Sequence, residues 1–390
     1  MNTPAVGNPG ALIYLVAGEE SGDRLGAALI RALRAARPDL RFAAVGGSHM
    51  AAEGVPSLFP LGELAIIGFA AIVKRLPALL RRIAETADAV VAAQPDLVVI
   101  IDSPEFTHRV ARKVRAKAPH IPIVDYVCPS VWAWRPGRAK AMRGYVDRVL
   151  ALLPFEPAAM ARLAGPPTDF VGHPLSEQVD KLRPEGGPAS RLQGPALVLA
   201  MPGSRSGEVR RMADVFGETL GRLAASAGPF EVAVPTVERL EATVREAVAR
   251  WPVAARVLTS QDEKYAAFRR ARAALAKSGT STLELALAGV PMVTGYKVAR
   301  PEAWVGRLLI KLPSVILPNL ILGRNVVPEF LQRDCSAENL ARELAPLLSD
   351  TPERKLQVEA FGELDRMMAL GEAAPSVKAA AVVLATMRRI

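Results

Sequence analysis

Short runs of Val, Ile, Leu and Ala alternate along the chain with longer stretches whose apolar residues recur every three to four positions. The short runs predict buried strands, and the longer periodic stretches predict helices. Continuous apolar strands that alternate with helices are typical of parallel sheets with both faces covered. The predicted strands are Ala11–Ala17, Arg41–Val45, Leu97–Ile101, Ile121–Val127, Arg148–Leu152, Ala196–Met201, Phe230–Val234, Arg256–Leu258, Ala273–Ala276 and Met292–Gly295.

The strand series is interrupted once, which predicts two doubly wound α/β domains. A chain of 390 residues also exceeds one ordinary core. The interruption, KLRPEGGPASRLQGP at residues 181–195, is rich in Pro and Gly and reads as a linker. We expect an N-terminal domain over 1–178, a linker over 179–195 and a C-terminal domain over 196–359. A last helix near Ser376–Ile390 has no strand after it, and residues 360–390 are expected to complete the first domain.

Composition limits the classes of function. Hydrophobic residues make up 50% of the chain and charged residues 23%, as in a folded globular protein. Cys128 and Cys335 are far apart in sequence, which argues against a disulfide framework and a cysteine-based zinc site. The four histidines show no HxH or HxxxH spacing, so we expect no metal centre.

No segment is predicted to cross a membrane. The N-terminus lacks the basic region of a secretory signal peptide, and the apolar run Leu64–Val73 is about half the length of a spanning helix. We therefore expect a cytoplasmic protein, or one bound to a membrane face from outside the bilayer.

Positive charge is concentrated in one part of the chain. The formal net charge is +10, and residues 105–150 alone hold ten lysines and arginines against three acidic residues. A local positive field attracts phosphates on lipids, nucleotides or nucleic acids.

Residues 64–83 combine an apolar face with basic residues. On a helical wheel the apolar face holds Ile66, Phe69, Ile72, Val73, Leu76, Leu79, Leu80 and Ile83, and the other side holds Lys74, Arg75, Arg81 and Arg82. Pro77 is expected to kink or break this helix. Two interpretations stay open: a helix that buries its apolar face in the domain, or one that lies on a membrane surface.

The first predicted strand runs into a glycine-rich turn. Glycines at 18, 22 and 26 let the backbone approach a ligand, although their spacing is not that of a dinucleotide fingerprint. Glu19 and Asp23 are unusual choices for a purely structural turn, which keeps a binding role open. The alternative is a tight turn with Ser21 as the helix N-cap.

Asp102 directly follows the apolar strand Leu97–Ile101. Strand ends face the ligand cleft of doubly wound sheets, so a carboxylate here could accept a proton from an attacking hydroxyl. The alternative is that Asp102 or Ser103 caps the next helix, with Pro104 in its first turn.

The segment PSVWAWRPGR, residues 129–138, places Trp132 and Trp134 beside Arg135 and Arg138. Aromatic faces suit a sugar or an acyl chain, and guanidinium groups suit a phosphate. One tryptophan in the core and one at the surface, or stacking on nucleic acid, are the alternatives.

Two small-residue turns of the second domain predict a nucleotide site. PGSRSGE, residues 202–208, follows a strand and offers N–H groups, a hydroxyl and a guanidinium to a diphosphate. SGTSTLE, residues 278–284, leads into a helix whose start suits the diphosphate, while Glu284 suits ribose hydroxyls. N-capped turns and a solvated glutamate are the alternatives.

The motifs together resemble the lipid-A-disaccharide synthase family over almost the whole chain. They are AGEESGD (17–23), VGG (45–47), IDSPEF (101–106), CPSVWAWR (128–135), LPFE (153–156), GHP (172–174), PGSRSGEV (202–209), SGTSTLE (278–284) and LPNLILGR (317–324). AGEESGD with PSVWAWR is specific to this family, whereas SGTSTLE occurs in many nucleotide-sugar glycosyltransferases. Glu20 departs from relatives that carry a small residue there.

This resemblance implies a GT-B fold, in which two Rossmann-like domains face a cleft and the C-terminal helix packs back on the first. It implies inverting transfer of 2,3-diacylglucosamine from its UDP conjugate to 2,3-diacylglucosamine-1-phosphate, on the cytoplasmic face of the inner membrane. UDP is the second product. No cofactor, metal or nucleic acid is required, contact with an anionic membrane surface is expected, and a homodimer is left open.

The resemblance also assigns roles to residues. Asp102 matches the proposed general base. The expected nucleotide-sugar residues are Gly203, Ser204, Arg205, Ser278, Gly279, Thr280, Glu284, Asn319, Arg324 and Glu329, with Gln332 nearby. The expected acceptor-side residues are Glu19, Ser21, Trp132, Arg135 and His173. Another GT-B enzyme, such as a lipid-linked sugar transferase or UDP-sugar epimerase, and a non-catalytic nucleic-acid-binding protein remain as alternatives.

Overall fold

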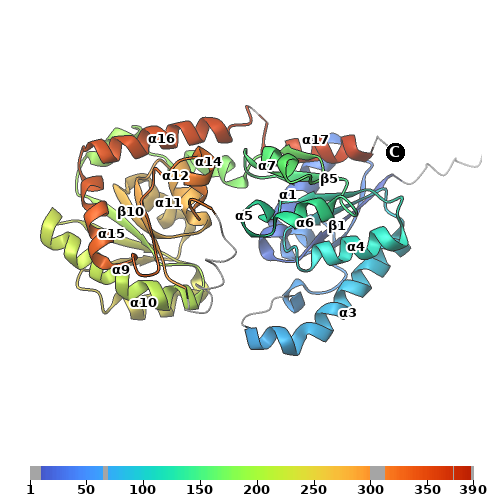
Figure 1. Ribbon diagram of the computed structural model, residues 1–390, viewed down its shortest axis with the longest axis horizontal. Helices are drawn as coiled ribbons and strands as arrows, with labels where there is room; N and C mark the ends of the chain where they lie inside the picture. The colour runs from blue at the N-terminus through green and yellow to red at the C-terminus, as the bar shows by residue number, and fades with distance from the viewer. Residues whose placement is uncertain (1–9, 65–68, 299–311, 372, 388–390) are drawn as a thin grey trace, which may run out of the picture. The chain divides into compact units, whose positions relative to one another are not determined.

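The computed structural model divides the chain into two units (Figure 1). Unit 1 consists of Met1–Pro174 and Leu370–Ile390, and unit 2 of Leu175–Ala369. The structure describes residues 10–64, 69–298, 312–371 and 373–387, and for residues 69–75 the backbone alone.

Unit 1 is built on a six-stranded parallel sheet in the order β2-β1-β3-β4-β5-β6. Its strands are β1 (Leu12–Ala17), β2 (Arg41–Val45), β3 (Leu97–Ile101), β4 (Ile123–Tyr126), β5 (Arg148–Ala151) and β6 (Thr168–Phe170). Its helices are α1 (Glu20–Ala36), α2 (Ser48–Ala52), α3 (Phe69–Ala93), α4 (Thr107–Lys117), α5 (Val131–Trp134), α6 (Pro136–Met142), α7 (Glu156–Arg162) and α17 (Pro375–Met387), with a 3₁₀ turn at Leu61–Leu64.

Both faces of this sheet are buried, as its apolar strands require. Because side chains alternate along a strand, Ile13 and Leu15 of β1 pack toward α1 and α17, whereas Tyr14 and Val16 join the core under α3, α4, α6 and α7. Ala379, Ala380 and Val383 of α17 belong to the same core as β1. The prediction that the C-terminal helix packs back on the first domain is therefore confirmed.

Unit 2 repeats this plan with the strand order β12-β11-β10-β7-β8-β9, again parallel throughout. Its strands are β7 (Leu197–Met201), β8 (Glu231–Pro235), β9 (Arg256–Leu258), β10 (Ala273–Lys277), β11 (Met292–Tyr296) and β12 (Glu329–Leu331). Its helices are α8 (Val179–Leu182), α9 (Ser206–Ala227), α10 (Glu241–Val248), α11 (Gln261–Arg270), α12 (Thr280–Leu287), α14 (Leu317–Leu322), α15 (Ala337–Leu344) and α16 (Pro352–Met368), with 3₁₀ turns at Pro174–Gln178, Pro188–Leu192, Glu238–Leu240 and Ala345–Leu348.

All ten predicted strands are present, with ends that shift by at most two residues. The pattern missed β6 and β12, the outermost strands of their sheets on one side. Each has only three residues, and none of the six is fully buried. Short edge strands carry too few apolar residues to give a periodic signal.

The segment predicted as a linker, residues 179–195, lies within unit 2. Arg191 is 3% exposed and donates hydrogen bonds to the carbonyl oxygens of Phe268, Ala271 and Ala288. Burial lowers the pKa of Arg191 to about 9. A buried guanidinium that satisfies three carbonyls fixes this segment to the C-terminal ends of α11 and α12, which composition alone could not reveal.

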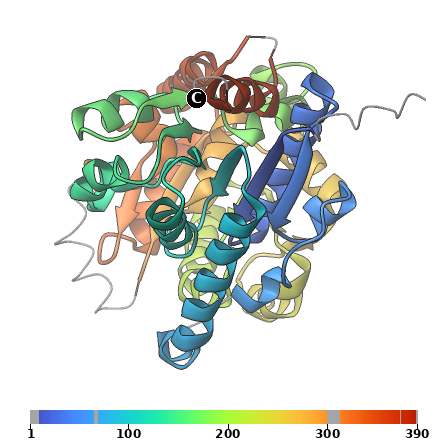
Figure 2. The same cartoon turned by 90° about the vertical axis from the view of Figure 1, so that its right-hand side faces the viewer.

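Helix α3 runs from Phe69 to Ala93 with Pro77 inside it, so the proline does not end the helix. Pro77 is exposed, so its ring lies on the solvent side of the helix. Figures 1 and 2 show the start of α3 extending beyond the sheet of unit 1.

The two strand orders place ligand sites at predictable points. In each sheet the chain first adds strands on one side of its first strand and then crosses to the other side. At the crossing point, the connections that leave two neighbouring strands therefore run in opposite directions. These switch points lie between β1 and β3 in unit 1, and between β7 and β10 in unit 2. The turns Gly18–Asp23 and Asp102–Phe106 follow the first pair, and the turns Pro202–Glu208 and Ser278–Glu284 follow the second.

Candidate functional site

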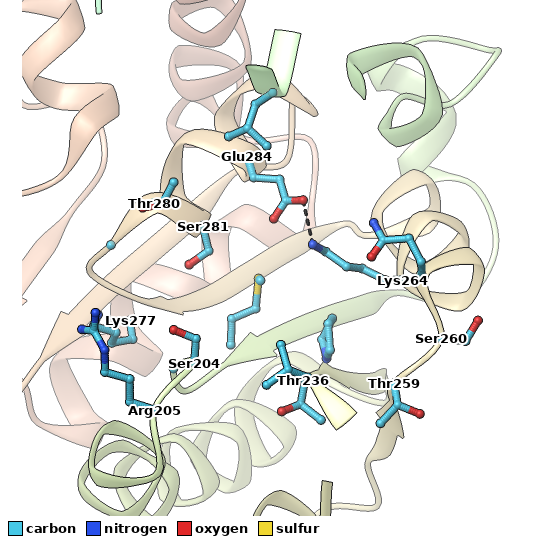
Figure 3. Close-up of a pocket in the computed structure, with 17 residues that line it drawn as sticks. Ser204, Arg205, Thr236, Thr259, Ser260, Lys264, Lys277, Thr280, Ser281 and Glu284 are labelled. Atoms are coloured by element: carbon cyan, nitrogen blue, oxygen red, sulfur yellow. Dashed lines mark hydrogen bonds and ion pairs between the residues drawn. The ribbon is translucent and has the colours of Figure 1, made fainter. Parts of the chain in front are cut away.

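A cavity of about 470 Å³ lies at the switch point of unit 2 (Figure 3). It collects residues that follow the carboxyl ends of β7, β8, β9 and β10. The lining residues are Leu175, Met201, Gly203, Ser204, Arg205, Pro235, Thr236, Val237, Thr259, Ser260, Gln261, Lys264, Lys277, Gly279, Thr280, Ser281 and Glu284.

The turn after β7 needs its glycine. Gly203 has φ +136°, which side-chain-bearing residues rarely adopt, and an added Cβ would lie 2.6 Å from Cβ of Glu208. The close approach brings the Glu208 carboxylate over the turn, where Oε2 accepts from the N–H groups of Ser204 (3.1 Å) and Arg205 (3.3 Å). The N–H groups predicted to hold a diphosphate are therefore already bound by Glu208.

Glu208 is also the partner of two cations. Its Oε1 lies 3.1 Å from Nζ of Lys277, the last residue of β10, and 3.3 Å from Nη1 of Arg205. Burial favours the neutral acid, but Lys277, the Ser204 N–H and Arg205 outweigh it and lower the pKa of Glu208. The Arg205 side chain is 78% exposed, so its guanidinium remains accessible to an anion at the cavity wall.

The opposite wall is the start of α12. Gly279 precedes the helix, and the first N–H groups of a helix have no partner within it. This end also carries the positive helix dipole, so it suits a diphosphate.

Glu284 lies inside α12, is 8% exposed, and accepts from Nζ of Lys264 at 2.7 Å. Figure 3 shows this ion pair at the edge of the cavity. One carboxylate oxygen is thus bound by Lys264 of α11, and the other can accept from a ligand hydroxyl.

Six of the predicted nucleotide-sugar residues line the cavity: Gly203, Ser204, Arg205, Gly279, Thr280 and Glu284. The structure places the other four elsewhere. Ser278 donates to Glu329, which also accepts from Ser314, and Arg324 pairs with Glu363 on the surface. Asn319 is 3% exposed, and its amide bonds the backbone of Val326 and Val327.

Sequence reasoning missed several polar lining residues. Thr236 follows β8, Thr259 and Ser260 follow β9, and Lys277 ends β10. The signal in the sequence is a polar residue directly after an apolar strand, the same signal that identifies Asp102. Lys264 gave no such signal, because it lies inside α11 and reaches the cavity through tertiary packing.

At the switch point of unit 1, Asp102 is held from both sides. Its Oδ2 accepts from Oγ of Ser21 at 3.0 Å, and its Oδ1 accepts from the N–H of Ser103 at 2.7 Å. Ser21 lies in the first turn of α1 and does not cap it, because Glu19 occupies the N-cap position. The turn after β1 is thus joined to the end of β3 through the side chains of Ser21 and Asp102.

The strand ends here are strained. Asp102 and Ser103 have φ +54° and +45°, and Val127 after β4 has φ +90°. These are three of the six non-glycine residues with positive φ in the described part of the chain. Such conformations cost about 1–3 kcal/mol each and concentrate at functional sites.

Asp23 has a structural role in unit 1. Its buried carboxylate accepts from the N–H groups of Gly47, His49 and Met50, which form the start of α2. Glu19 is exposed. Of the two acidic residues of this turn, Asp23 therefore caps α2 and Glu19 lies on the surface.

The two tryptophans after β4 differ in environment. Nε1 of Trp132 donates to Glu156 at 3.2 Å, and its ring meets Phe155 edge to face. Burial raises the pKa of Glu156 to about 7. Trp134 is 37% exposed, and the guanidinium of Arg135 lies over its ring at 4.1 Å.

His173 follows Gly172 near the end of the first segment of unit 1. Burial lowers the pKa of His173 to about 4, so the ring is neutral near pH 7. A neutral imidazole can accept or donate a hydrogen bond but supplies no charge for a phosphate.

The apolar wheel of residues 64–83 is only partly buried. Ile83 is 1% exposed and Leu79 packs against the same core, whereas Leu76 and Leu80 are 40% and 46% exposed. Arg81 is exposed, and Arg82 bonds Glu63 and Glu85 and lies over Phe59. Ile66 and the side chains of Phe69, Ile72, Val73, Lys74 and Arg75 lie outside the described residues.

Across the described ranges, none of the helices has the length and apolar character needed to span a bilayer.

Comparisons with known proteins agree with this architecture. A family model described as lipid-A-disaccharide synthetase matches residues 13–380. Lipid-A-disaccharide synthase of Nitrobacter hamburgensis is 57% identical over 382 residues, covering 97% of this chain and 96% of that protein. The protein of the same name from Bradyrhizobium diazoefficiens is 56% identical and covers 98% of both.

Solved structures share the fold at low identity. MurG of Acinetobacter baumannii aligns with a TM-score of 0.59 at 14% identity, covering 97% of this chain and all of that chain. UDP-GlcNAc 2-epimerase of Neisseria meningitidis, bound to UDP-GlcNAc, aligns with a TM-score of 0.58 at 12% identity, covering 97% and 100%. The fold is GT-B, and the chain belongs to the lipid-A-disaccharide synthase family.

Proposed function

We propose that the protein joins UDP-2,3-diacylglucosamine to 2,3-diacylglucosamine-1-phosphate, giving a β-1,6-linked disaccharide 1-phosphate and UDP. The family supports a glycosyltransferase of this type. The acceptor 6-hydroxyl attacks C1 of the donor sugar opposite the leaving diphosphate. The O6–C1 bond forms as the bond from C1 to the diphosphate oxygen breaks, so the anomeric centre inverts.

The cavity of unit 2 is the proposed site for UDP. Arg205 and the start of α12 supply positive potential for the diphosphate that leaves. Lys277 adds a cation beside them, since its Nζ is shared with Glu208 at the same wall. The second oxygen of Glu284 is the proposed acceptor for ribose hydroxyls. Thr236, Thr259 and Ser260 offer hydroxyl groups for the rest of the nucleoside.

Asp102 is the proposed general base, and the observation that carries this proposal is its placement. It stands at a strand end on the switch point, with its carboxylate oriented by Ser21 and by the N–H of Ser103. The carboxylate takes the proton of the acceptor 6-hydroxyl as that oxygen bonds to C1. Removing a general base typically costs 10²–10⁴-fold in rate, which is about 3–5 kcal/mol.

The test is Asp102→Asn, because asparagine tolerates positive φ and keeps the side-chain shape. We expect kcat to fall by roughly 10²–10⁴-fold while the affinity for UDP stays at the wild-type value. Ser21→Ala is the matched control, because it removes one orienting hydrogen bond and leaves the base. We expect it to lose far less activity. A kcat for Asp102→Asn within threefold of wild type would rule out this base.

Contact with the cytoplasmic face of the inner membrane is proposed from two exposed apolar side chains of α3. Leu76 and Leu80 are neighbours on the helix surface, and Arg81 adds positive charge for anionic headgroups. Leu76→Ser with Leu80→Ser should reduce sedimentation with anionic phospholipid vesicles. Unchanged sedimentation, with the same secondary structure by circular dichroism, would contradict it.

A further inference from the structure

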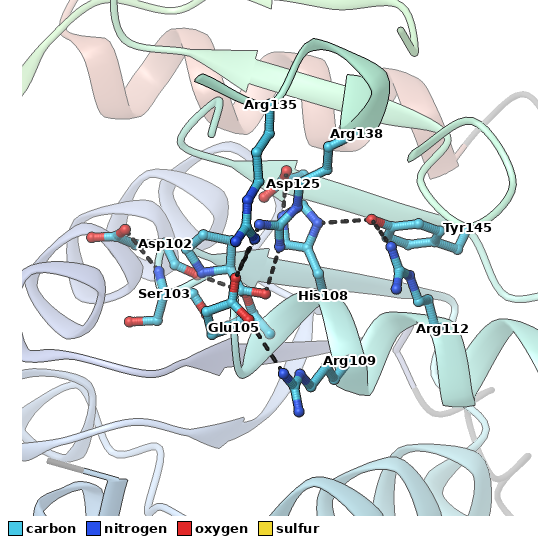
Figure 4. A network of polar contacts seen from close by, with 12 residues as sticks. Asp102, Ser103, Glu105, His108, Arg109, Arg112, Asp125, Arg135, Arg138 and Tyr145 are labelled. Carbon is cyan, nitrogen blue, oxygen red and sulfur yellow. Dashed lines mark hydrogen bonds and ion pairs between the residues drawn. The ribbon is translucent and has the colours of Figure 1, made fainter. Parts of the chain in front are cut away.

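Three arginines converge on one carboxylate beside Asp102: Arg109 from α4, Arg138 from α6, and Arg135 from between α5 and α6 (Figure 4). Oε2 of Glu105 lies 3.3 Å from Nη2 of Arg109, and Oε1 lies 3.2 Å from Nη1 of Arg138 and 3.6 Å from Nη1 of Arg135. Three guanidinium groups around one carboxylate leave a net charge of +2. The cluster therefore holds more positive charge than its own acid neutralises.

The arginines differ in exposure. The side chain of Arg138 is 15% exposed, and it also donates to the carbonyl oxygen of Pro104 at 3.0 Å. Arg109 and Arg135 are 44% and 53% exposed, and Arg135 lies over the ring of Trp134. Arg138 is thus the most buried of the three. Arg109 and Arg135 present N–H donors toward solvent while their contacts with Glu105 and Trp134 hold them in place.

Stability does not account for this arrangement. Exposed ion pairs contribute about 0–1 kcal/mol each, and three like charges close together repel. Although burial favours the neutral acid, Arg138 and Arg109 outweigh it and lower the pKa of Glu105. Glu105 is therefore an ionised, 61% exposed partner that another anion can replace.

The helix that carries Arg109 is held rigidly. Below it, Nε2 of His108 lies 3.1 Å from Oδ2 of Asp125 on β4, and Nδ1 of His108 lies 3.0 Å from the Tyr145 hydroxyl. Both His108 and Asp125 are buried. A fixed helix lowers the entropy cost of placing a guanidinium on a ligand.

The cluster is also tied to the proposed base. Glu105 is in the turn that begins at Asp102, and Oγ1 of Thr107, the first residue of α4, donates to the carbonyl oxygen of Asp102. An anion bound by these arginines would lie in the neighbourhood of Asp102, all within unit 1.

We propose that Arg109, Arg135 and Arg138 bind the phosphate monoester of the acceptor substrate, with Glu105 orienting the three guanidinium groups. This inference rests on the proposed function and names the group that selects the acceptor. A phosphate monoester carries a charge of about −1.5 to −2 near pH 7 and binds guanidinium groups in a bidentate manner. A phosphodiester headgroup carries a single charge and matches the excess of +2 less well.

The test compares 2,3-diacylglucosamine-1-phosphate with the same acceptor lacking the phosphate, each in detergent micelles with saturating donor. The measured quantity is the ratio of the two kcat/KM values. We expect Arg109→Ala with Arg135→Ala to lower this ratio by about tenfold or more, because each charge-assisted bond contributes roughly that factor. The KM for the UDP-sugar should not change. Lys113→Ala with Lys140→Ala is the matched control, since it removes two exposed charges from helices α4 and α6.

The outcomes separate the two proposals. If the wild type makes disaccharide but the ratio is the same in the arginine variant, or falls equally in the lysine control, the phosphate site is refuted and the transferase stands. If the wild type uses neither acceptor, both proposals fall. If the arginine variant keeps the ratio but no longer sediments with phosphatidylglycerol vesicles, the cluster binds lipid headgroups and the inference is wrong. Glu105→Gln should keep the ratio at or above the wild-type value, and a fall to that of the arginine variant would also overturn it.

Discussion

Glu284→Gln tests the nucleotide site most directly. One oxygen of the Glu284 carboxylate is bound by Lys264 at 2.7 Å, which leaves the other for the ribose hydroxyls. A hydrogen bond to a charged group contributes about 1.5–3 kcal/mol, and 1.4 kcal/mol is a factor of ten in affinity. We therefore expect the wild type to bind UDP roughly 10- to 100-fold more tightly than 2′,3′-dideoxyuridine diphosphate.

The variant also frees Lys264, whose charge then acts on the diphosphate. That effect is common to both ligands, so the ratio of the two dissociation constants isolates the contribution of the hydroxyls. Isothermal titration calorimetry gives each constant. We expect the ratio for Glu284→Gln to approach one.

Lys264→Met is the control, because it removes the cation and keeps the carboxylate. It should retain most of the preference for UDP, although its absolute affinities change. If Glu284→Gln keeps the wild-type ratio, Glu284 does not bind the ribose, and its pairing with Lys264 is structural.

Two further predictions concern the stability of unit 1. Because burial raises the pKa of Glu156 to about 7 from 4.5, the folded state holds a proton that the unfolded chain releases. The contribution of this group to the free energy of unfolding is fully present below about pH 4.5 and is lost as the pH rises through about 7. The loss lowers the free energy of unfolding by at most about 3 kcal/mol. Glu156→Gln should remove this loss, as measured by urea unfolding at about pH 5 and about pH 8, and an unchanged pH dependence would contradict it. Asp23→Ala should destabilise unit 1 by about 3 kcal/mol, because it leaves three N–H groups without their acceptor. Glu20→Ala, which breaks an exposed pair with Arg24 in the same helix, should cost far less in the same urea measurement, and equal effects would refute the capping role of Asp23.

Local pattern was sufficient for ten of the twelve strands in the described part of the chain and for the turns that form the sites. Apolar runs such as Leu97–Ile101 and Ala273–Ala276 can be read from neighbours in sequence, because burial on both faces of a parallel sheet demands unbroken hydrophobicity. Polar residues at the ends of those strands follow from the same pattern. Asp102 and Arg205 were identified in this way, and both lie at switch points.

The partners of those residues were decided by the tertiary structure. Asp23 caps a helix that begins 25 positions later, and Glu208 covers the turn whose N–H groups had been assigned to a ligand. Asn319 was placed in the cleft by resemblance, but its amide is consumed by the backbone of Val326 and Val327. Each contact depends on where hydrogen-bond donors from other segments lie.

The sequence by itself determined two doubly wound sheets and the residues at their strand ends, because periodicity and burial are local properties of the chain. Only the tertiary structure decided that Lys264 and Lys277 reach the nucleotide cavity and that three arginines share Glu105. The physical reason is that charge pairing acts across space. The crossover of each sheet brings together segments that no short-range pattern connects.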